Sequence, residues 1–252
     1  MSYTIGFAGK GGTGKSTIAS IVTRYLATKK NPPVLAIDAD PNTSLGEMLG
    51  VIPEDTVVGI IDDIAANISN LPIGITKERL IESRIQQALG ESEGLDLLVM
   101  GRPEGPGCYC YPNSLMRETI GRLERSYNYI VIDNEAGMEH ISRRTDRKID
   151  YLFIVSDHSA HAVRSAKRIL DLANELKISS GKTHLLINRA KDGLPSLDGE
   201  ISKLSVDKVS FIKESNDLAR VSAEGKPITE LAEDSDIIGS IYNMCKEAFK
   251  ES

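Results

Sequence analysis

The sequence has little cysteine, no tryptophan and no long hydrophobic run. Only three of its 252 residues are cysteines, namely Cys108, Cys110 and Cys245. No stretch reaches the roughly 18 consecutive apolar residues of a membrane-spanning helix, and residues 1–5 show no secretory signal pattern. We therefore expect a cytoplasmic protein, where cysteines serve more often as metal ligands or reactive thiols than as disulfides.

Basic residues are too few and too scattered for a nucleic-acid-binding surface. The chain has 30 Lys and Arg against 36 Asp and Glu, which gives a formal net charge of -6. Its basic runs are short, as in Lys29-Lys30. Nucleic-acid-binding domains usually carry a basic stripe, and anionic membranes attract basic clusters. Neither nucleic acid nor a membrane surface is therefore an expected partner.

Short apolar runs alternate with helical patterns along the chain, which is typical of an α/β fold. Most of the runs are continuously apolar, as in strands that are covered on both faces. We expect a doubly wound, mostly parallel sheet of about seven or eight strands flanked by helices, in a single domain over residues 1–252. The expected strands are Tyr3–Ala8, Val34–Asp38, Leu95–Met100, Tyr129–Asp133, Tyr151–Ser156, Thr183–Asn188 and Lys208–Ile212.

Apolar residues recur at helical spacing in three segments, 18–26, 163–173 and 237–248. Residues 50–93 are less regular and predict two further helices at the surface. Residues 101–113 are rich in glycine and proline, which predicts a loop.

A glycine-rich segment after the first expected strand matches the phosphate-binding pattern G-x-x-x-x-G-K-[ST]. It precedes an expected helix, which is the context that the pattern requires. Glycines let backbone N–H groups surround phosphate oxygens, and the helix N-terminus adds positive potential. We expect Lys15 to reach the β- and γ-phosphates of ATP, Ser16 to bind Mg²⁺ and Thr17 to bind the α-phosphate. The segment is Gly9-Lys10-Gly11-Gly12-Thr13-Gly14-Lys15-Ser16.

A second lysine, Lys10, stands near the start of this segment. Its sequence Lys-Gly-Gly-Thr-Gly-Lys-Ser resembles the deviant Walker A motif of the MinD, ParA and nitrogenase iron-protein ATPases. In that family the extra lysine reaches the nucleotide of the facing subunit and offsets transition-state charge as an arginine finger does. The resemblance implies a Mg²⁺-dependent ATPase that forms a homodimer, with Lys10 and Lys15 as catalytic residues.

Two acidic segments follow expected strands, as they do in that family. Asp38 and Asp40 resemble switch I, and the resemblance implies that Asp40 activates the attacking water while Asp38 lies near Mg²⁺. Asp133 resembles the Walker B residue that holds the Mg²⁺ shell, and Gly137 the switch II glycine whose N–H senses the γ-phosphate. The alternative for each aspartate is an ordinary helix cap.

Two further segments resemble the walls of the family's nucleobase pocket. Asn188 ends an expected strand, and the resemblance implies that it reads the adenine edge while Arg189 stacks nearby. Pro227, within Gly225-Lys226-Pro227-Ile228, resembles the opposite wall. Asn188 is also a common residue in plain turns, which is the other interpretation.

Cys108 and Cys110 lie one residue apart in the glycine- and proline-rich loop. A disulfide in so small a ring is strained, whereas two thiolates on an extended loop favour Zn²⁺, Ni²⁺, Cu⁺ or an iron–sulfur cluster. A four-ligand site needs a second chain, which the family's dimer supplies. We hypothesise one metal ion between two subunits; the alternative is a pair of partly buried thiols. Cys245 fits core packing.

This loop and Val131–His140 together resemble the CooC-type maturation ATPases of nickel-dependent carbon monoxide dehydrogenase, and the related AcsF-type accessory proteins of acetyl-CoA synthase. The resemblance covers nearly the whole chain. It implies ATP-dependent delivery of nickel to one of these two enzymes as client. The sequence leaves the choice of client open, and also the choice between Ni²⁺ and Zn²⁺, since both accept four thiolates.

Two other functions remain as alternatives. A positioning ATPase like MinD or ParA would bind a membrane or DNA, but the tail 242–252 is short and mixed in charge. An electron-transfer or iron–sulfur scaffold ATPase would carry a cysteine in switch II or a C-x-x-C pair near the C-terminus. Residues 133–144 contain no cysteine, and the C-terminal pair is absent.

Overall fold

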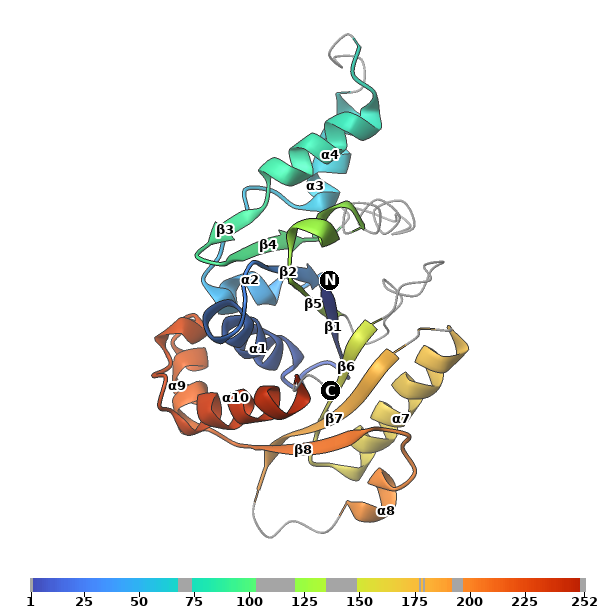
Figure 1. Cartoon of the computed structure of the whole chain (residues 1–252), viewed down its shortest axis with the longest axis vertical. Helices are drawn as coiled ribbons and strands as arrows, with labels where there is room; N and C mark the ends of the chain where they lie inside the picture. Colours follow the sequence, from blue (N-terminus) through green and yellow to red (C-terminus); the bar gives the residue numbers. More distant parts are fainter. Residues whose placement is uncertain are drawn as a thin grey trace.

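An eight-stranded sheet forms the centre of the protein. The computed structural model describes residues 2–67, 74–102, 121–134, 149–176, 178, 180–191 and 197–249. Figure 1 shows how the strands within these residues lie side by side. They are β1 (Tyr3–Ala8), β2 (Val34–Ala39), β3 (Gly90–Ser92), β4 (Leu95–Val99), β5 (Tyr129–Asn134), β6 (Ile149–Asp157), β7 (Ser180–Ala190) and β8 (Lys208–Lys213).

The strand order is β3-β4-β2-β5-β1-β6-β7-β8. Every pairing is parallel except that of β3 with β4, which is antiparallel. The first strand of the chain therefore lies inside the sheet, between β5 and β6. Because parallel strands end at the same edge, the carboxyl ends of β1, β2, β5, β6 and β7 lie together there, which is where ligands bind in open α/β sheets.

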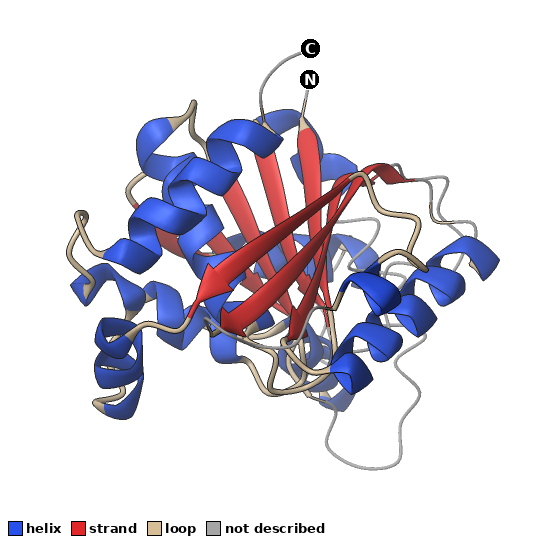
Figure 2. Cartoon of the chain, turned by 90° about the horizontal axis from the view of Figure 1, so that it is seen from below, coloured by secondary structure: helices blue, strands red, loops and turns tan. Residues whose placement is uncertain are grey.

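Helices cover both faces of the sheet, as Figure 2 shows from below. The helices are α1 (Lys15–Lys29), α2 (Ser44–Leu49), α3 (Val57–Ala66), α4 (Lys77–Gln87), α7 (Ala160–Glu175), α8 (Asp198–Ile201), α9 (Asn216–Ala223) and α10 (Asp236–Ala248), with 3-10 turns η2 (Glu124–Ser126) and η3 (Ile228–Glu230).

Three apolar clusters join the helices to the sheet. The largest packs α1, α2 and α10 on one face. A second packs α3 and α4 against β2, β4 and β5, and a third packs α7 against β6 and β7. All six residues of β2 are buried, as expected for a strand covered on both sides.

The helical periodicities predicted from sequence are confirmed. The apolar residues of segment 18–26 are all buried on α1, and α7 and α10 bury their expected faces in the same way. Cys245 is fully buried within α10, which confirms its place in the core. Residues 50–93 contain the two expected helices, α3 and α4, although five residues of α3 are buried.

All seven expected strands are present. β1 has the expected bounds, the other six differ at one end or both, and β6 and β7 extend further at both ends than their apolar runs. β3 was not predicted from sequence. It has three residues, of which Glu91 and Ser92 are exposed, so it offers no apolar pattern. It forms through a tight turn at Gly94, whose φ is 71°. No helix among the described residues is long and apolar enough to cross a membrane.

Candidate functional site

The site lies at the carboxyl edge of the sheet, around the loop that follows β1. Strand register brings two acidic residues together there. Asp38 of β2 lies opposite Asp133 of β5, and Asp133 lies opposite Phe7 of β1. Residues nearly one hundred positions apart thus become neighbours beside the glycine-rich segment 9–16, which we call the phosphate loop.

The backbone of the phosphate loop needs glycine at particular positions. A Cβ on Gly9 would lie 2.3 Å from the carbonyl oxygen of Val155 on β6. Gly12 has a φ of 80° with open space beside it, so the loop presents backbone there without an intervening side chain. Thr13 closes the turn, because its N–H and Oγ1 donate to the Lys10 carbonyl at 3.3 and 2.8 Å.

The N-terminus of α1 points out of this loop without a side-chain cap. Its N-cap residue is Gly14, with a φ of 92°, and no acidic residue lies in the first turn. By contrast, α3, α4, α7 and α9 are each capped by a serine or threonine oxygen. The first N–H groups of α1 and the buried Lys15 therefore provide positive potential that no described side chain neutralises by capping.

Three carboxylates lie beside the loop, and their bonding differs. Asp38 is fully buried and accepts the N–H groups of Asp40 at 3.1 Å and Leu45 at 2.9 Å. Asp40 accepts both the backbone and side-chain N–H groups of Asn42 on Oδ1. Asp133 is fully buried, yet neither of its oxygens has a hydrogen-bond partner among the described residues.

These environments disfavour negative charge in the absence of a cation. Burial raises the pKa of Asp38 to about 7, with the Leu45 N–H opposing and the Asp133 charge reinforcing the shift. Burial also raises the pKa of Asp133 to about 6, against the opposing effects of Ser16 and Lys15. Ser16 is near enough to stabilise the Asp133 carboxylate without meeting the geometry of a hydrogen bond.

The unpartnered Asp133 carboxylate fits the outer shell of a Mg²⁺ ion that Ser16 would hold. Mg²⁺ commonly takes few protein ligands and completes its shell with water and substrate phosphates. Within the described ranges, no group of three or more His, Cys, Asp or Glu side chains could hold a metal ion by itself. One serine hydroxyl and nearby carboxylates beside a phosphate-binding loop suit Mg²⁺ that arrives with a phosphorylated ligand.

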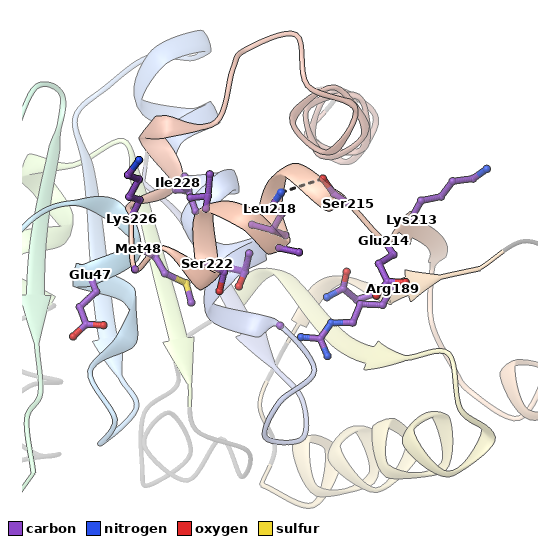
Figure 3. A pocket seen from close by; sticks show the side chains of 16 residues that line it. Glu47, Met48, Arg189, Lys213, Glu214, Ser215, Leu218, Ser222, Lys226 and Ile228 are labelled. Carbon is purple, nitrogen blue, oxygen red and sulfur yellow. Dashed lines mark hydrogen bonds between the residues drawn. The ribbon is translucent and has the colours of Figure 1, made fainter.

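A pocket of ≈ 380 Å³ opens beside the phosphate loop. Figure 3 shows α2 and α9 side chains on one wall and residues from the ends of β7 and β8 on another. The wall residues are Glu47, Met48, Leu218, Ala219, Val221, Ser222, Gly225, Lys226 and Ile228 on the first side, and Asn188, Arg189, Lys213, Glu214 and Ser215 on the second, with Gly14 and Thr17 from the phosphate loop and helix α1.

Two consecutive residues at the end of β7 both line this pocket, although strand neighbours normally point to opposite faces. The cause is an irregular backbone: the register with β8 shifts between Ile187 and Ala190, and Arg189 has a φ of 53°. Such a conformation is unfavourable for a residue with a side chain and often marks a functional site. It brings the Asn188 and Arg189 side chains to one cavity.

Asn188 also ties the pocket to the phosphate loop. Its Nδ2 donates to the Thr13 carbonyl at 2.8 Å. A Cβ on Gly14 would lie 2.4 Å from the same nitrogen. The interpretation of Asn188 as a plain turn residue therefore does not account for its contacts, which join two segments 175 positions apart.

The structure brings most of the residues selected from sequence to this edge. Asp38, Asp40 and Asp133 lie beside the phosphate loop, Thr17 follows it, and Asn188 and Arg189 line the pocket. Pro227 does not line it; its ring packs on Gly50, while Lys226 and Ile228 form the wall. Gly137, Cys108 and Cys110 lie outside the described residues.

Sequence reasoning missed the contributions of α2, the end of β8 and α9 to the pocket. For β8 and α9 the sequence did offer a signal. α9 follows directly after the carboxyl end of β8, where ligands bind in such sheets, and Ser215 caps the helix by accepting the Leu218 N–H. No sequence pattern pointed to Glu47 and Met48, because α2 has only six residues.

Comparison with known proteins gives consistent results. The family described as CobQ/CobB/MinD/ParA nucleotide binding domain matches residues 5–228. An uncharacterised ATP-binding protein of Methanocaldococcus jannaschii is 35% identical over 246 residues, which is 96% of this chain and 97% of that protein. The carbon monoxide dehydrogenase accessory protein CooC of Rhodospirillum rubrum is 30% identical over 187 residues, 70% of this chain and 71% of that protein.

The fold also matches solved structures. The MinC:MinD cell division protein complex of Aquifex aeolicus contains a chain that aligns with a TM-score of 0.72 at 20% identity, covering 100% of this chain and 97% of that one. The expected doubly wound, mostly parallel sheet is therefore confirmed both by the strand order and by this likeness.

Proposed function

Because the chain belongs to the CobQ/CobB/MinD/ParA nucleotide-binding family, we propose that it is a Mg²⁺-dependent ATPase that uses ATP hydrolysis to handle a metal ion. The observation that carries the ATPase is the uncapped N-terminus of α1 beside the buried Lys15 and the unpartnered carboxylate of Asp133. The positive helix N-terminus and Lys15 complement the negative triphosphate, and the negative Asp133 complements the cation bound with it.

We assign the phosphate end of the site as follows. N–H groups of the phosphate loop surround the β-phosphate, and Lys15 contacts the β- and γ-phosphates. Ser16 would hold Mg²⁺, with Asp38 and Asp133 in its outer shell. Bound Mg²⁺ would supply stabilisation of the charge on the transferring phosphoryl group. Thr17, which lines the pocket next to the loop, binds the α-phosphate.

Hydrolysis needs an oriented water and an offset for transition-state charge. Both hydrogen bonds from Asn42 go to Oδ1 of Asp40, so Oδ2 is the oxygen assigned to the attacking water. Lys10 is exposed, unlike the buried Lys15, which suits a side chain that reaches a second subunit. We propose a homodimer in which Lys10 acts on the partner's nucleotide and the Gly137 N–H senses the γ-phosphate.

The pocket of ≈ 380 Å³ is the proposed adenine site. Asn188 keeps an amide oxygen for the adenine amino group while its nitrogen holds the Thr13 carbonyl. Arg189 stacks on the base. Pro227 supports the opposite wall from behind, through Gly50.

The metal-handling part rests on Cys108 and Cys110 and on the likeness to CooC. We propose that Ni²⁺, or Zn²⁺, is carried between two subunits on the four thiolates. The cargo then passes to carbon monoxide dehydrogenase or acetyl-CoA synthase when hydrolysis moves switch II. Thiolates are the ligands that such soft cations select.

Native mass spectrometry tests this proposal, with and without Ni²⁺ and ATP. We expect one metal ion per dimer in the wild type and none in a Cys108→Ala, Cys110→Ala double variant. Cys245→Ala is the matched control, because this thiol is fully buried and burial raises its pKa. Unchanged metal stoichiometry in the double variant would remove the metal-carrying role and leave the ATPase.

A positioning ATPase is the second candidate, favoured by the likeness of the fold to MinD in its complex with MinC. It predicts ATP-dependent binding to anionic liposomes or to DNA. Co-sedimentation with each, with ATP and with ADP, separates the two functions: nucleotide-dependent sedimentation supports positioning, and its absence together with metal binding supports the metal carrier.

A further inference from the structure

Helix α2 touches the residue assigned to Mg²⁺. Its first residue, Ser44, donates a hydrogen bond from Oγ to the Oγ of Ser16 at 3.0 Å. The two serines are 28 positions apart and both are partly buried. None of the family features described above assigns a role to Ser44.

The position of Ser44 is fixed by the packing of α2. The next residue, Leu45, is fully buried and donates its N–H to Asp38 at 2.9 Å. A Cβ on Gly46 would lie 2.9 Å from the Val51 carbonyl oxygen and 3.0 Å from Leu97. The helix therefore packs closely against its neighbours, and this packing holds Ser44 beside Ser16.

The contact constrains how the Ser16 hydroxyl can turn. A serine hydroxyl has one proton to donate and two lone pairs that accept. Ser44 occupies one lone pair, which leaves one lone pair and the proton. The Asp133 carboxylate lies near Ser16 and has no hydrogen-bond partner among the described residues, so a small turn of the Ser16 hydroxyl can bring the proton to it. The remaining lone pair is then free for a cation.

We propose that Ser44 is a positioning residue for Mg²⁺: its hydrogen bond orients the Ser16 hydroxyl so that a lone pair faces the ion. This inference rests on the proposed ATPase function. The hydrogen bond makes the affinity for Mg²⁺ depend on the position of α2. The same helix also contributes Glu47 and Met48 to the nucleobase pocket. One short helix thereby contacts both ends of the nucleotide site.

The test is the Mg²⁺ dependence of nucleotide binding, measured by fluorescence of a methylanthraniloyl-ADP probe titrated with MgCl₂. Ser44→Ala should raise the half-saturating Mg²⁺ concentration by about threefold to tenfold, the usual range for losing one hydrogen bond. Binding of the probe in EDTA should stay within about twofold of wild type. Ser44→Thr, which keeps the hydroxyl, should restore the wild-type Mg²⁺ requirement.

Ser202→Ala is the matched control, since it deletes an exposed hydroxyl on the far side of the sheet from α2. If Ser44→Ala does not fold, Ser44→Cys serves in its place, because a thiol fills the same space with only a weak donor. An unchanged Mg²⁺ requirement overturns the inference. So does an equal loss of probe binding with and without Mg²⁺. A wild-type protein that does not bind the probe with or without Mg²⁺ refutes the proposed nucleotide site itself.

Discussion

The two ends of the nucleotide site are built in different ways. The phosphate end comes from one continuous segment, residues 9–17, joined by carboxylates from β2 and β5. The pocket proposed to hold the nucleobase, called the nucleobase end below, is assembled from α2, the ends of β7 and β8, α9 and the turn before η3. The first has fixed backbone geometry and few side chains, while the second has many side chains from segments far apart.

This difference predicts different responses to substitution. At the phosphate end each group is held in one position and no neighbouring group can take over its contact, so single changes should have large effects. At the nucleobase end the contacts are shared among many residues, so single changes should have small ones. Asn188 and Gly14 stand where the two ends meet.

The largest effect should come from Lys15→Ala. Removing the buried cation at the phosphates should lower ATP turnover by at least about 100-fold, as expected for a preorganised charge that stabilises a transition state. Lys226→Ala deletes a cation at the nucleobase end and should change turnover by less than about threefold. Phosphate release at saturating ATP measures both; equal losses would show that the two ends do not differ.

Gly14→Ala should have the next largest effect, on folding as well as on binding. Alanine at a φ of 92° with a Cβ 2.4 Å from Asn188 should cost about 1–3 kcal/mol in the free energy of unfolding. Gly11→Ala is the control, because no atom lies within 4 Å of its added Cβ. Urea denaturation measures both. If the Asn188 contact matters, Asn188→Ala should recover part of the loss.

Arg189→Ala should have a moderate effect confined to the nucleobase. Losing a cation stacked on a base should weaken ATP binding by about fivefold, which corresponds to about 1 kcal/mol. Binding of inorganic tripolyphosphate, which has no base, should not change. Competition against a fluorescent nucleotide measures both ligands, with Lys191→Ala as the exposed control. Equal weakening of both ligands would place Arg189 at the phosphates instead.

The last effect concerns the pH dependence of stability and not binding or turnover. Burial raises the pKa of Asp38 from 3.8 to about 7, so the folded state takes up a proton at this carboxyl between those values. Its contribution to the free energy of unfolding is therefore present at low pH and is lost as pH rises through about 7.

Urea denaturation in EDTA at about pH 5 and about pH 8 measures this contribution. Asp38→Asn should reduce the loss of stability at the higher pH, whereas Glu214→Gln, on an exposed carboxyl at the nucleobase end, should not. An identical pH dependence in wild type and Asp38→Asn would contradict the raised pKa of Asp38 as its cause.

Local pattern explains why much of the fold could be predicted. The helices α1, α7 and α10 have apolar residues at a regular spacing, and most strands are apolar runs of ordinary length. β3 could not be predicted, since two of its three residues are exposed and β4 is its only partner among the strands that the structure describes. The carboxyl end of β7 was also missed, because the backbone irregularity there lies in its pairing with β8, which no local pattern shows.

The sequence by itself determined the phosphate loop, because glycine spacing and a following helix are local properties that residues 9–16 carry in full. Only the tertiary structure decided which carboxylates face that loop, that Ser44 meets Ser16, and which side chains enclose the pocket. Those contacts follow from strand order and helix packing, which bring together residues that no local pattern connects.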